Sequence, residues 1–490
     1  MSVADAVRRD APSGTPVRRP FLLVTALAVV VLTVAVLQTA VVPVLGIMAE
    51  QLHTSATAVS WAVTANLLAA AAATPLLGRL ADLYSKRRVL LAVLVVVLAG
   101  SVLAATTASL PLLITARVLQ GASFALYPIS IAILRDELPP DRLGRAMAVM
   151  SGTLGFGGGA GLVVTGLLMT DGAVYQRVFW LCTAFTLAVI VIAVLIVPVR
   201  HRRATGTLDW FGAAGLALGL SLGLLAITQG SHWGWTSPST LGAAAASVVI
   251  LVGWWCWEQR AAHPLVSTRM LSRRPMLLTN LATIFVGMGL YFAFLGITLF
   301  VQVPRDQAGF GFSATVLQAS VVYLLPGACT GFVVALVSGR FIDRYGARPV
   351  LMVGALAGIG GFVFIAVAHT HTWQVIAAAV LTNAYISLGY GALPALVVGE
   401  APPGATGIAT GMNAIARTIG SSVAAALVAV AVAGSTTAAP SEAGFTAIFA
   451  GGAVTALFAM LLIGLSRTGR PAFETVEARQ ESRAMNHEWG

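Results

Sequence analysis

Fourteen apolar stretches limit what this chain can fold into more than any other feature of its sequence. A helix needs about 20 apolar residues to cross the hydrocarbon core of a bilayer, where its backbone groups must be hydrogen-bonded within the helix itself. The stretches lie at 21–48, 57–77, 89–108, 111–133, 143–168, 177–198, 210–230, 240–257, 276–301, 315–338, 349–368, 373–398, 405–433 and 444–466. The sequence therefore predicts an all-α polytopic membrane protein with fourteen transmembrane helices.

The composition supports a membrane protein. Only 10% of the residues are charged and 58% are hydrophobic, whereas soluble proteins carry about 25% charged residues. The net charge of +11 does not indicate nucleic-acid binding, because the basic residues are spread over short loops between the apolar stretches. We expect a monomer whose partners are the lipid bilayer and a small-molecule substrate, with no nucleic acid.

The basic residues also predict the orientation in the membrane. If the amino terminus is cytoplasmic, all of the 29 Lys and Arg residues fall on the cytoplasmic side except Arg117, Arg177, Arg305 and Arg417. If one helix were miscounted, every later loop would be assigned to the wrong side of the membrane and the pattern would be lost. The pattern therefore favours fourteen spans. We expect a multi-pass protein of the bacterial cytoplasmic (inner) membrane. Its two tails, 1–20 and 467–490, are both expected in the cytoplasm.

A charged motif occurs twice, at equivalent places. GRLADLYSKRR at 78–88 and GRFIDRYGARP at 339–349 share the pattern Gly-Arg-x-x-Asp-x-Tyr-x-x-Arg, offset by 261 residues. A solvated loop does not explain why the Asp and the Tyr recur at the same offsets. The repeat indicates two related helical bundles that can rock against each other. We interpret Gly78 as a tight turn that ends the preceding helix.

The spacing of this repeat predicts the domain organisation. Two adjoining six-helix bundles would give twelve spans, so two helices must be inserted between them. We expect one bundle at 21–200, the inserted pair with cytoplasmic linkers at 201–275, and the second bundle at 276–466. The glycines of the GxxxGxxxG ridge at 215–223 allow close helix packing. The inserted pair is therefore expected to pack rather than to bind substrate.

The duplicated motif resembles motif A of the major facilitator superfamily, and the inserted pair resembles that of its fourteen-helix drug:proton antiporter branch. ITARVLQGASFALYP at 114–128 resembles motif B of these antiporters, and the whole resemblance covers about 20–466. It implies a major facilitator fold of two six-helix bundles plus two inserted helices. It also implies an alternating-access transporter, not an enzyme, which exports small amphiphilic drugs or natural products. The proton gradient would supply the energy, with no cofactor and no metal.

Two positions depart from that branch. Phe156-Gly157 stands where motif C has Gly-Pro, and Gln38 stands where these antiporters usually carry a buried acid. An amide cannot titrate, so the usual proton site of the first helix is missing. The alternative function is a proton-independent facilitator or uptake transporter for a small neutral or anionic solute.

The resemblance assigns a conformational switch to motif A. It implies that Asp82 makes a charge contact with the opposing bundle, which holds one access state and breaks in the other. Asp343 with Arg344 would be the counterpart in the second bundle. The full set of switch candidates is Gly78, Arg79, Asp82, Arg87, Arg88, Gly339, Arg340, Asp343 and Arg344.

Three residues are candidates for proton coupling. Arg117 lies about six residues, or roughly 9 Å, inside its predicted span. A charge at that depth is expensive unless it faces protein or water, and the resemblance implies a role in proton coupling. The alternative is that the side chain reaches back to the outer interface. Asp82 and Glu400, which ends the twelfth span, are the other candidates.

The charges within the predicted spans bear on the substrate. Arg117 and Arg417 are the only charges in mid-span, and no Asp, Glu or His lies at that depth. Such a cavity disfavours lipophilic cations, so we expect neutral or anionic substrates. The alternative is that Arg417 pairs with a loop acid and never reaches the cavity. Without clustered His or carboxylates the residues do not support an enzyme.

The other candidates for the substrate path are polar or aromatic residues within the spans. Any one alone is more often a helix–helix contact than a ligand contact. Together, on helices of both bundles, they predict a pocket for amphiphilic molecules. They are Gln38, Asn66, Gln120, Tyr127, Tyr291, Gln318, Tyr323, Asn383, Tyr385, Asn413 and Arg417.

Overall fold

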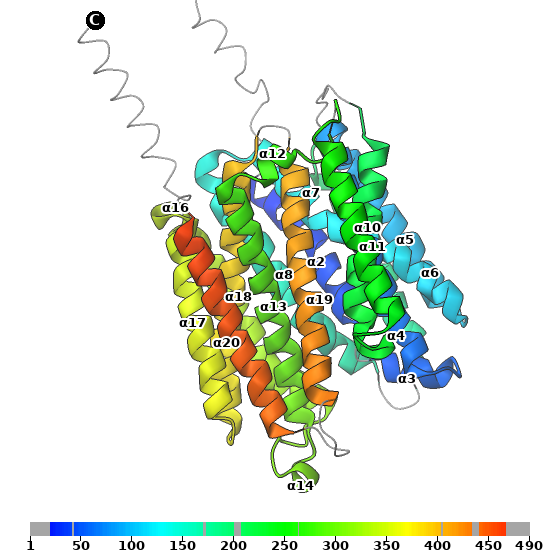
Figure 1. The fold of residues 1–490 in the computed structure, drawn as a ribbon, viewed down its shortest axis with the longest axis vertical. Helices are drawn as coiled ribbons and strands as arrows, with labels where there is room; N and C mark the ends of the chain where they lie inside the picture. Colours follow the sequence, from blue (N-terminus) through cyan, green and yellow to red (C-terminus); the bar gives the residue numbers. More distant parts are fainter. Residues whose placement is uncertain are drawn as a thin grey trace, which may run out of the picture.

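The computed structural model describes residues 20–41, 44–169, 173–199, 207–262, 264–402, 405–433 and 441–466. Over these ranges the chain forms helices joined by short connections, and no strand occurs there (Figure 1). The two tails expected in the cytoplasm lie outside the described residues, apart from Pro20. So does the start of the predicted linker, at 200–206.

Fourteen helices of the described part are long and apolar enough to cross a membrane, which confirms the predicted number. The first half of the chain forms α2 (Pro20–Thr39), α3 (Leu45–Gln51), α4 (Ala56–Leu83), α5 (Lys86–Thr106), α6 (Leu110–Gly121), η2 (Ala122–Ala125), α7 (Leu126–Glu137), α8 (Pro140–Leu168) and α9 (Gln176–Ile196). The consecutive segments α6, η2 and α7 make one span, and α3 is too short to be one.

The inserted pair consists of α10 (Trp210–Trp233) and α11 (Pro238–Glu258). The second half then forms α12 (Thr268–Leu271), α13 (Arg274–Gln302), α14 (Arg305–Ala308), α15 (Val316–Gln318), η3 (Ala319–Leu324), α16 (Leu325–Tyr345), α17 (Ala347–Val367), α18 (Thr372–Glu400), α19 (Thr406–Ala433) and α20 (Glu442–Leu465). We call α2–α9 the first half and α12–α20 the second half.

The helices keep apolar side chains on their outer surfaces as well as inside. Val95, Leu195, Phe211 and Val367 are among the large apolar residues that are more than half exposed. In water such a surface would be unfavourable, whereas lipid tails solvate it. The chain is therefore a multi-pass membrane protein.

The two motif glycines lie inside helices rather than at turns, so the interpretation of Gly78 as a helix end is wrong. Helix α4 continues to Leu83, and α16 continues past Gly339 to Tyr345. Both glycines are sites of close helix approach. A Cβ at Gly78 would lie 2.9 Å from the carbonyl oxygen of Gly407, and one at Gly339 would lie 2.7 Å from the Cα of Arg145.

The two halves meet along two seams, which these close approaches mark. In one seam α4 packs on α19, and in the other α16 packs on α8. Helix α10 packs against both α4 and α19, so the inserted pair lies over the first seam (Figure 1). Leu216 and Leu220 of α10 share a buried cluster there with Ala71 of α4 and Ile408 and Ile415 of α19.

The packing within the second half can be tested at Gly420 of α19. A Cβ there would be driven into the backbone carbonyl of Ile284 on α13, and overpacking of this kind costs about 1–3 kcal/mol. We expect Gly420→Ala to lower the melting temperature of the detergent-purified protein by several degrees. The matched control is Gly360→Ala, because a Cβ at Gly360 meets nothing within 4 Å. Equal melting temperatures for the two variants would contradict the described approach of α13 and α19.

Candidate functional site

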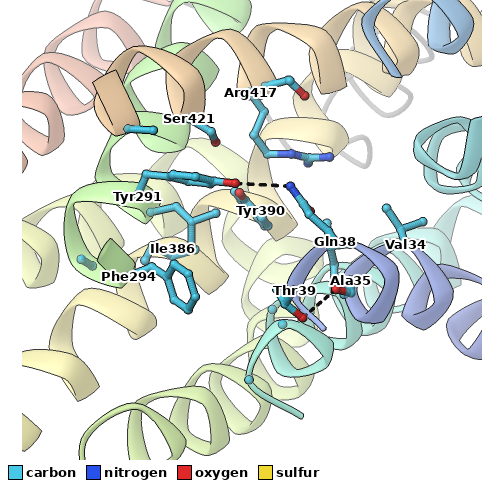
Figure 2. Close-up of a pocket in the computed structure, with 18 of the residues that line it drawn as sticks. Val34, Ala35, Gln38, Thr39, Tyr291, Phe294, Ile386, Tyr390, Arg417 and Ser421 are labelled. Carbon is cyan, nitrogen blue, oxygen red and sulfur yellow. Dashed lines mark hydrogen bonds between the residues drawn. The ribbon is translucent and has the colours of Figure 1, made fainter. Parts of the chain in front are cut away.

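A pocket lies between the two halves (Figure 2), and residues near the middle of α8, α13, α18 and α19 line it. Its walls come from α2 and α8 of the first half and from α13, α18 and α19 of the second. Most of the lining is apolar, and Phe294 and Ile386 form part of one side. None of the described residues that line the pocket is Asp, Glu or His. The arrangement suits an amphiphilic small molecule with few polar groups.

Arg417 of α19 is the only charged residue of this lining. The guanidinium carbon lies 4.8 Å from the ring centroid of Tyr390 and 5.1 Å from that of Tyr127. Tyr390 belongs to α18 and Tyr127 to α7, so the cation rests on one aromatic ring from each half. Among the described residues, no carboxylate pairs with Arg417. The predicted pairing with a loop acid is therefore not found there.

A hydrogen bond crosses the pocket beside this cation. The Nε2 group of Gln38 on α2 donates to the hydroxyl oxygen of Tyr291 on α13, at 3.4 Å (Figure 2). Gln38 takes the place of the acid expected from the antiporter branch, and its amide therefore makes a neutral link between the halves. At 3.4 Å the bond is long, so a substrate can displace it at little cost.

Tyr127 lies behind Arg417 instead of on the pocket surface. Its hydroxyl is 3.0 Å from the hydroxyl of Ser151 on α8, which in turn donates to the backbone carbonyl of Tyr390 at 2.5 Å. These contacts hold α7, α8 and α18 together at the middle of the membrane. Tyr127 thus supports the pocket without lining it.

Arg117 is placed outside the pocket, which corrects the expectation of two cations in the cavity. The side chain is 1% exposed, so the alternative that it reaches the outer interface is also wrong. Its Nε donates to the carbonyl of Ala62 at 3.1 Å, and its Nη1 donates to the carbonyl of Leu37 at 3.2 Å and to Oε1 of Gln120 at 2.7 Å. Carbonyl dipoles stabilise this buried charge, because the hydrogen bonds replace its hydration.

Asn66 and Gln120 belong to the same buried network and do not line the pocket. Asn66 donates to the backbone carbonyl of Arg117 at 2.9 Å, and Gln120 donates to the hydroxyl of Ser101 at 3.0 Å. The network connects α2, α4, α5 and α6. These polar groups therefore hold the first half together.

Four further candidates also lie away from the pocket lining. Asn413 donates to Asn280 at 3.0 Å and to Thr283 at 2.7 Å, which joins α19 to α13. Gln318 accepts from the backbone of its neighbour Thr315 at the start of α15. The Tyr323 hydroxyl is 3.4 Å from that of Thr372, and Tyr385 is completely buried. Asn413, Tyr323 and Tyr385 act in helix packing, whereas the exposed Gln318 caps the start of its own helix.

The structure thus brings Gln38, Tyr291, Asn383 and Arg417 together in the pocket, out of the eleven predicted residues. Sequence reasoning missed Tyr390. A signal was available, because positions 383, 386 and 390 recur at helical spacing on one face of α18 and all three line the pocket.

The inserted pair also contributes to the pocket. Thr228 of α10 belongs to the lining, and Trp233 at the end of α10 packs on Trp61 of α4 with ring centroids 6.4 Å apart. The expectation that the pair only packs is therefore incomplete. The reason is its position over the α4–α19 seam, which the GxxxGxxxG ridge at 215–223 did not reveal.

At one end of the helices, which we call the motif end, Asp82 joins the two halves. Its Oδ1 accepts from the backbone N–H of Gly407 at 3.0 Å, and its Oδ2 accepts from that of Ile408 at 2.9 Å. These N–H groups belong to the first turn of α19, where they have no partner within the helix and where the helix dipole favours an anion. The contact with the opposing half is therefore made with backbone amides.

Asp343 makes the corresponding contact from the second half to the second turn of α8. Its Oδ2 accepts from Nε of Arg145 at 3.0 Å, and a Cβ at Gly144 would collide with its Oδ1. Arg344, predicted to act with Asp343 as the counterpart of Asp82, is exposed and rests on its neighbour Tyr345, 5.3 Å from the ring centroid. Asp343 therefore makes the contact with the opposing half through Arg145, and Arg344 does not share it.

The other basic residues of the motif face their own half or the surface. Arg87 donates to the carbonyl of Val194 on α9 at 2.6 Å, so it holds α5 to α9 within the first half. Arg88 and Arg340 are exposed, while Arg79 is partly buried and its Nε has no hydrogen-bond partner among the described residues. The Asp and Gly positions of the two motifs are therefore the ones that cross between the halves.

Arg135 is a cross-half contact that sequence reasoning missed. Its Nη2 donates to the carbonyl of Ala401 at 3.0 Å, and its Nη1 donates to the hydroxyl of Thr406. The side chain thus reaches from α7 to the connection between α18 and α19. Glu400, the last residue of α18, directly precedes that connection.

A mid-membrane pocket between two packed halves, with paired contacts at one end, defines a membrane transport protein. The chain belongs to the Major Facilitator Superfamily, whose sequence profile matches residues 27–425. As a transporter of this superfamily it acts on small molecules across the bilayer and is not an enzyme.

Among bacterial relatives, the chain is 29% identical over 444 residues to the tetracenomycin C resistance and export protein of Streptomyces glaucescens, covering 86% of this chain and 79% of that one. It is 28% identical to a multidrug resistance protein B homolog of Mycobacterium tuberculosis, over 62% of this chain and 56% of that one. It is 29% identical to a uridine/deoxyuridine transporter of Lactococcus lactis, over 66% of this chain and 67% of that one.

The fold has a counterpart among solved structures. The crystal structure of the human organic anion transporter MFSD10 superimposes with a TM-score of 0.63, covering 92% of this chain and 100% of that one. The sequence identity is 16%, so the likeness concerns the fold. It confirms the major facilitator fold that the duplicated motif predicts.

The Asp82 contact can be tested with Asp82→Asn. The substitution removes the charge that the first turn of α19 favours, a contribution of about 1 kcal/mol, which shifts a two-state balance about five-fold. We expect spin-label distances across the motif end of the purified protein to shift towards the open population. The control is Asp209→Asn, because the Asp209 carboxylate accepts hydrogen bonds from Gly212 and Trp257 within the inserted pair. Distances that do not change in Asp82→Asn would show that this contact does not hold the halves together.

Proposed function

We propose that this protein exports small amphiphilic molecules, such as drugs or natural products, by alternating access coupled to the proton gradient. The observation that carries the proposal is the mid-membrane pocket, whose lining comes from both halves and is mostly apolar. The resistance and export functions named for its relatives support the proposed outward direction of transport and the proposed class of substrate. No cofactor is required.

In the proposed cycle the two halves, α2–α9 and α12–α20, tilt as units about the pocket. The Asp82 contact with α19, the Asp343–Arg145 pair and the Arg135 contacts then close the motif end. Each is a polar contact near the surface, worth about 1 kcal/mol or less. A few such contacts favour one state without preventing the other, as alternating access requires.

Proton coupling would have to use groups outside the pocket, because no described lining residue is an acid. Asp82 is our first candidate. Protonation of its carboxylate would remove the charge that α19 stabilises, and would therefore favour opening of the motif end. Glu400, next to the Arg135 contact, is a second candidate. Arg117 stays a candidate on the motif B resemblance alone, since its donors bind carbonyl groups.

We further propose that the motif end faces the cytoplasm of a bacterial cell, with both termini on that side, and that the protein acts as a monomer. The distribution of basic residues between the apolar spans supports this orientation. Lys86, Arg87, Arg344 and Arg348 all lie at the motif end.

The alternative function is uptake or proton-independent facilitated diffusion of a small neutral or anionic solute. The uridine/deoxyuridine transporter among the relatives supports this possibility, and so does the neutral Gln38 in the first span. The two functions differ in their energy source and in the direction of net transport.

Transport in inside-out membrane vesicles separates the two. A susceptibility panel in an efflux-deficient bacterial host first identifies a compound to which the protein gives resistance. We expect energised vesicles to accumulate that compound. An uncoupler should reduce the accumulation at least ten-fold. Vesicles with Asp82→Asn should accumulate less, because coupling between opening and protonation is lost. If the compound only reaches equal concentrations on the two sides of the membrane, and the uncoupler does not change its rate of entry, the protein is a facilitator instead.

A further inference from the structure

The two arginines in the interior of the membrane are held in different ways. Arg117 makes three hydrogen bonds, to Ala62, Leu37 and Gln120, and does not line the pocket. Arg417 lines the pocket, where its guanidinium lies over the rings of Tyr127 and Tyr390 and is also hydrogen-bonded to the Tyr127 side chain. The fold therefore supplies Arg117 with three acceptors, while the guanidinium of Arg417 borders the pocket.

The surroundings of Arg417 leave its charge uncompensated. A guanidinium has five N–H donors, more than two neighbouring tyrosines can satisfy. Aromatic rings attract the cation through their faces and do not neutralise it. Since no described residue of the lining is acidic, a positive charge faces a mostly apolar cavity that offers it no counter-charge, and an uncompensated charge is costly there.

The same wall carries hydroxyl groups. Thr418, Ser421 and Ser422 line the pocket directly after Arg417 along α19. The Oγ of Ser422 is buried and has no hydrogen-bond partner among the described residues. Within the described lining the Ser422 hydroxyl is therefore a buried donor without an acceptor. The hydroxyl of Tyr291 and the amide of Gln38 point into the same space (Figure 2).

We propose that Arg417 is the recognition group of this pocket and that the transported molecule carries an oxyanion, a carboxylate or phenolate, on an aromatic body. The oxyanion accepts hydrogen bonds from the guanidinium, with Ser422 as a further donor. Bonds between ionised groups are about twice as strong as neutral ones. The body of the substrate packs on Phe294, Ile386 and the ring of Tyr390. This inference rests on the proposed transport function and specifies its substrate class.

A cationic substrate of the same shape is disfavoured by the same geometry. It would have to leave water and enter a cavity whose only charge has the same sign. Neutral molecules neither gain the attraction to the Arg417 charge nor incur the repulsion that a cation meets. The pocket therefore ranks otherwise similar ligands by charge, with anions first and cations last.

Two xanthene dyes of similar shape and opposite charge test this ranking. The purified full-length protein is placed in phosphatidylcholine nanodiscs, and binding of fluorescein (anionic) and rhodamine 6G (cationic) is followed by fluorescence anisotropy against empty nanodiscs. We expect saturable binding of fluorescein at least ten-fold tighter than that of rhodamine 6G. Equal or tighter binding of rhodamine 6G overturns the inference, and so does the absence of saturable fluorescein binding.

Variants at the site assign the effect to Arg417. Arg417→Gln should weaken fluorescein binding at least ten-fold and reduce the preference over rhodamine 6G, while Arg417→Lys, which keeps the charge, should recover part of it. Ser422→Ala should weaken fluorescein binding about three-fold, and it serves as the second variant if Arg417→Gln fails to fold. Unchanged fluorescein affinity in a folded Arg417→Gln protein overturns the proposal.

Transport of the same dyes in proteoliposomes with a proton gradient separates this inference from the proposed function. If fluorescein binds through Arg417 but is not moved by the gradient, the charge recognition holds and proton-driven export fails. If rhodamine 6G is moved by the gradient and fluorescein is not, export holds and the charge recognition fails.

Discussion

The hydrogen bonds between Asp82 and the first turn of α19 join the two halves at the motif end. They form because two glycines, Gly78 and Gly407, allow α4 and α19 to approach so closely that a Cβ on either would meet the carbonyl oxygen of the other. The carboxylate then lies where the unpaired N–H groups of a helix start need an acceptor. The N–H groups at the start of a helix lack partners within the helix, which is unfavourable in lipid. Here these groups of α19 bind the opposing half instead. Asp343 and α8 repeat the arrangement with a side-chain partner, Arg145.

In the membrane interior, the hydrogen-bond partners of a buried polar group indicate what that group does. A charge that the fold needs for packing must find its hydrogen bonds within the protein, as Arg117 does with backbone carbonyls and Gln120. A charge that the protein uses on a substrate keeps part of its bonding capacity unmet, as Arg417 does between Tyr127 and Tyr390. Arg117 and Arg417 are the same residue type at a similar depth, so they differ in the groups that contact their guanidinium. Partners are visible only in three dimensions.

The sequence predicts the fourteen spans, the duplicated motif and the superfamily, because length, hydropathy and repeats are properties of the chain itself. It predicts less of the site. Asn66 and Asn413 read as substrate contacts, yet each faces a neighbouring helix. Arg344 follows Asp343 in sequence, but Arg145, almost 200 residues earlier, lies against it. Helical periodicity shows which residues share a face, whereas the helix that this face meets depends on how the halves assemble.

The position of the inserted pair has a consequence for how the two seams are covered. Helix α10 lies over the seam between α4 and α19, and the seam between α8 and α16 is on the other pair of helices. Helix α10 therefore separates the α4–α19 seam from the surrounding lipid, whereas close helix approaches, such as that of Gly152 to Ala335, fill the α8–α16 seam. The two halves are thus covered unequally, because one seam has an extra protein layer that the other does not have.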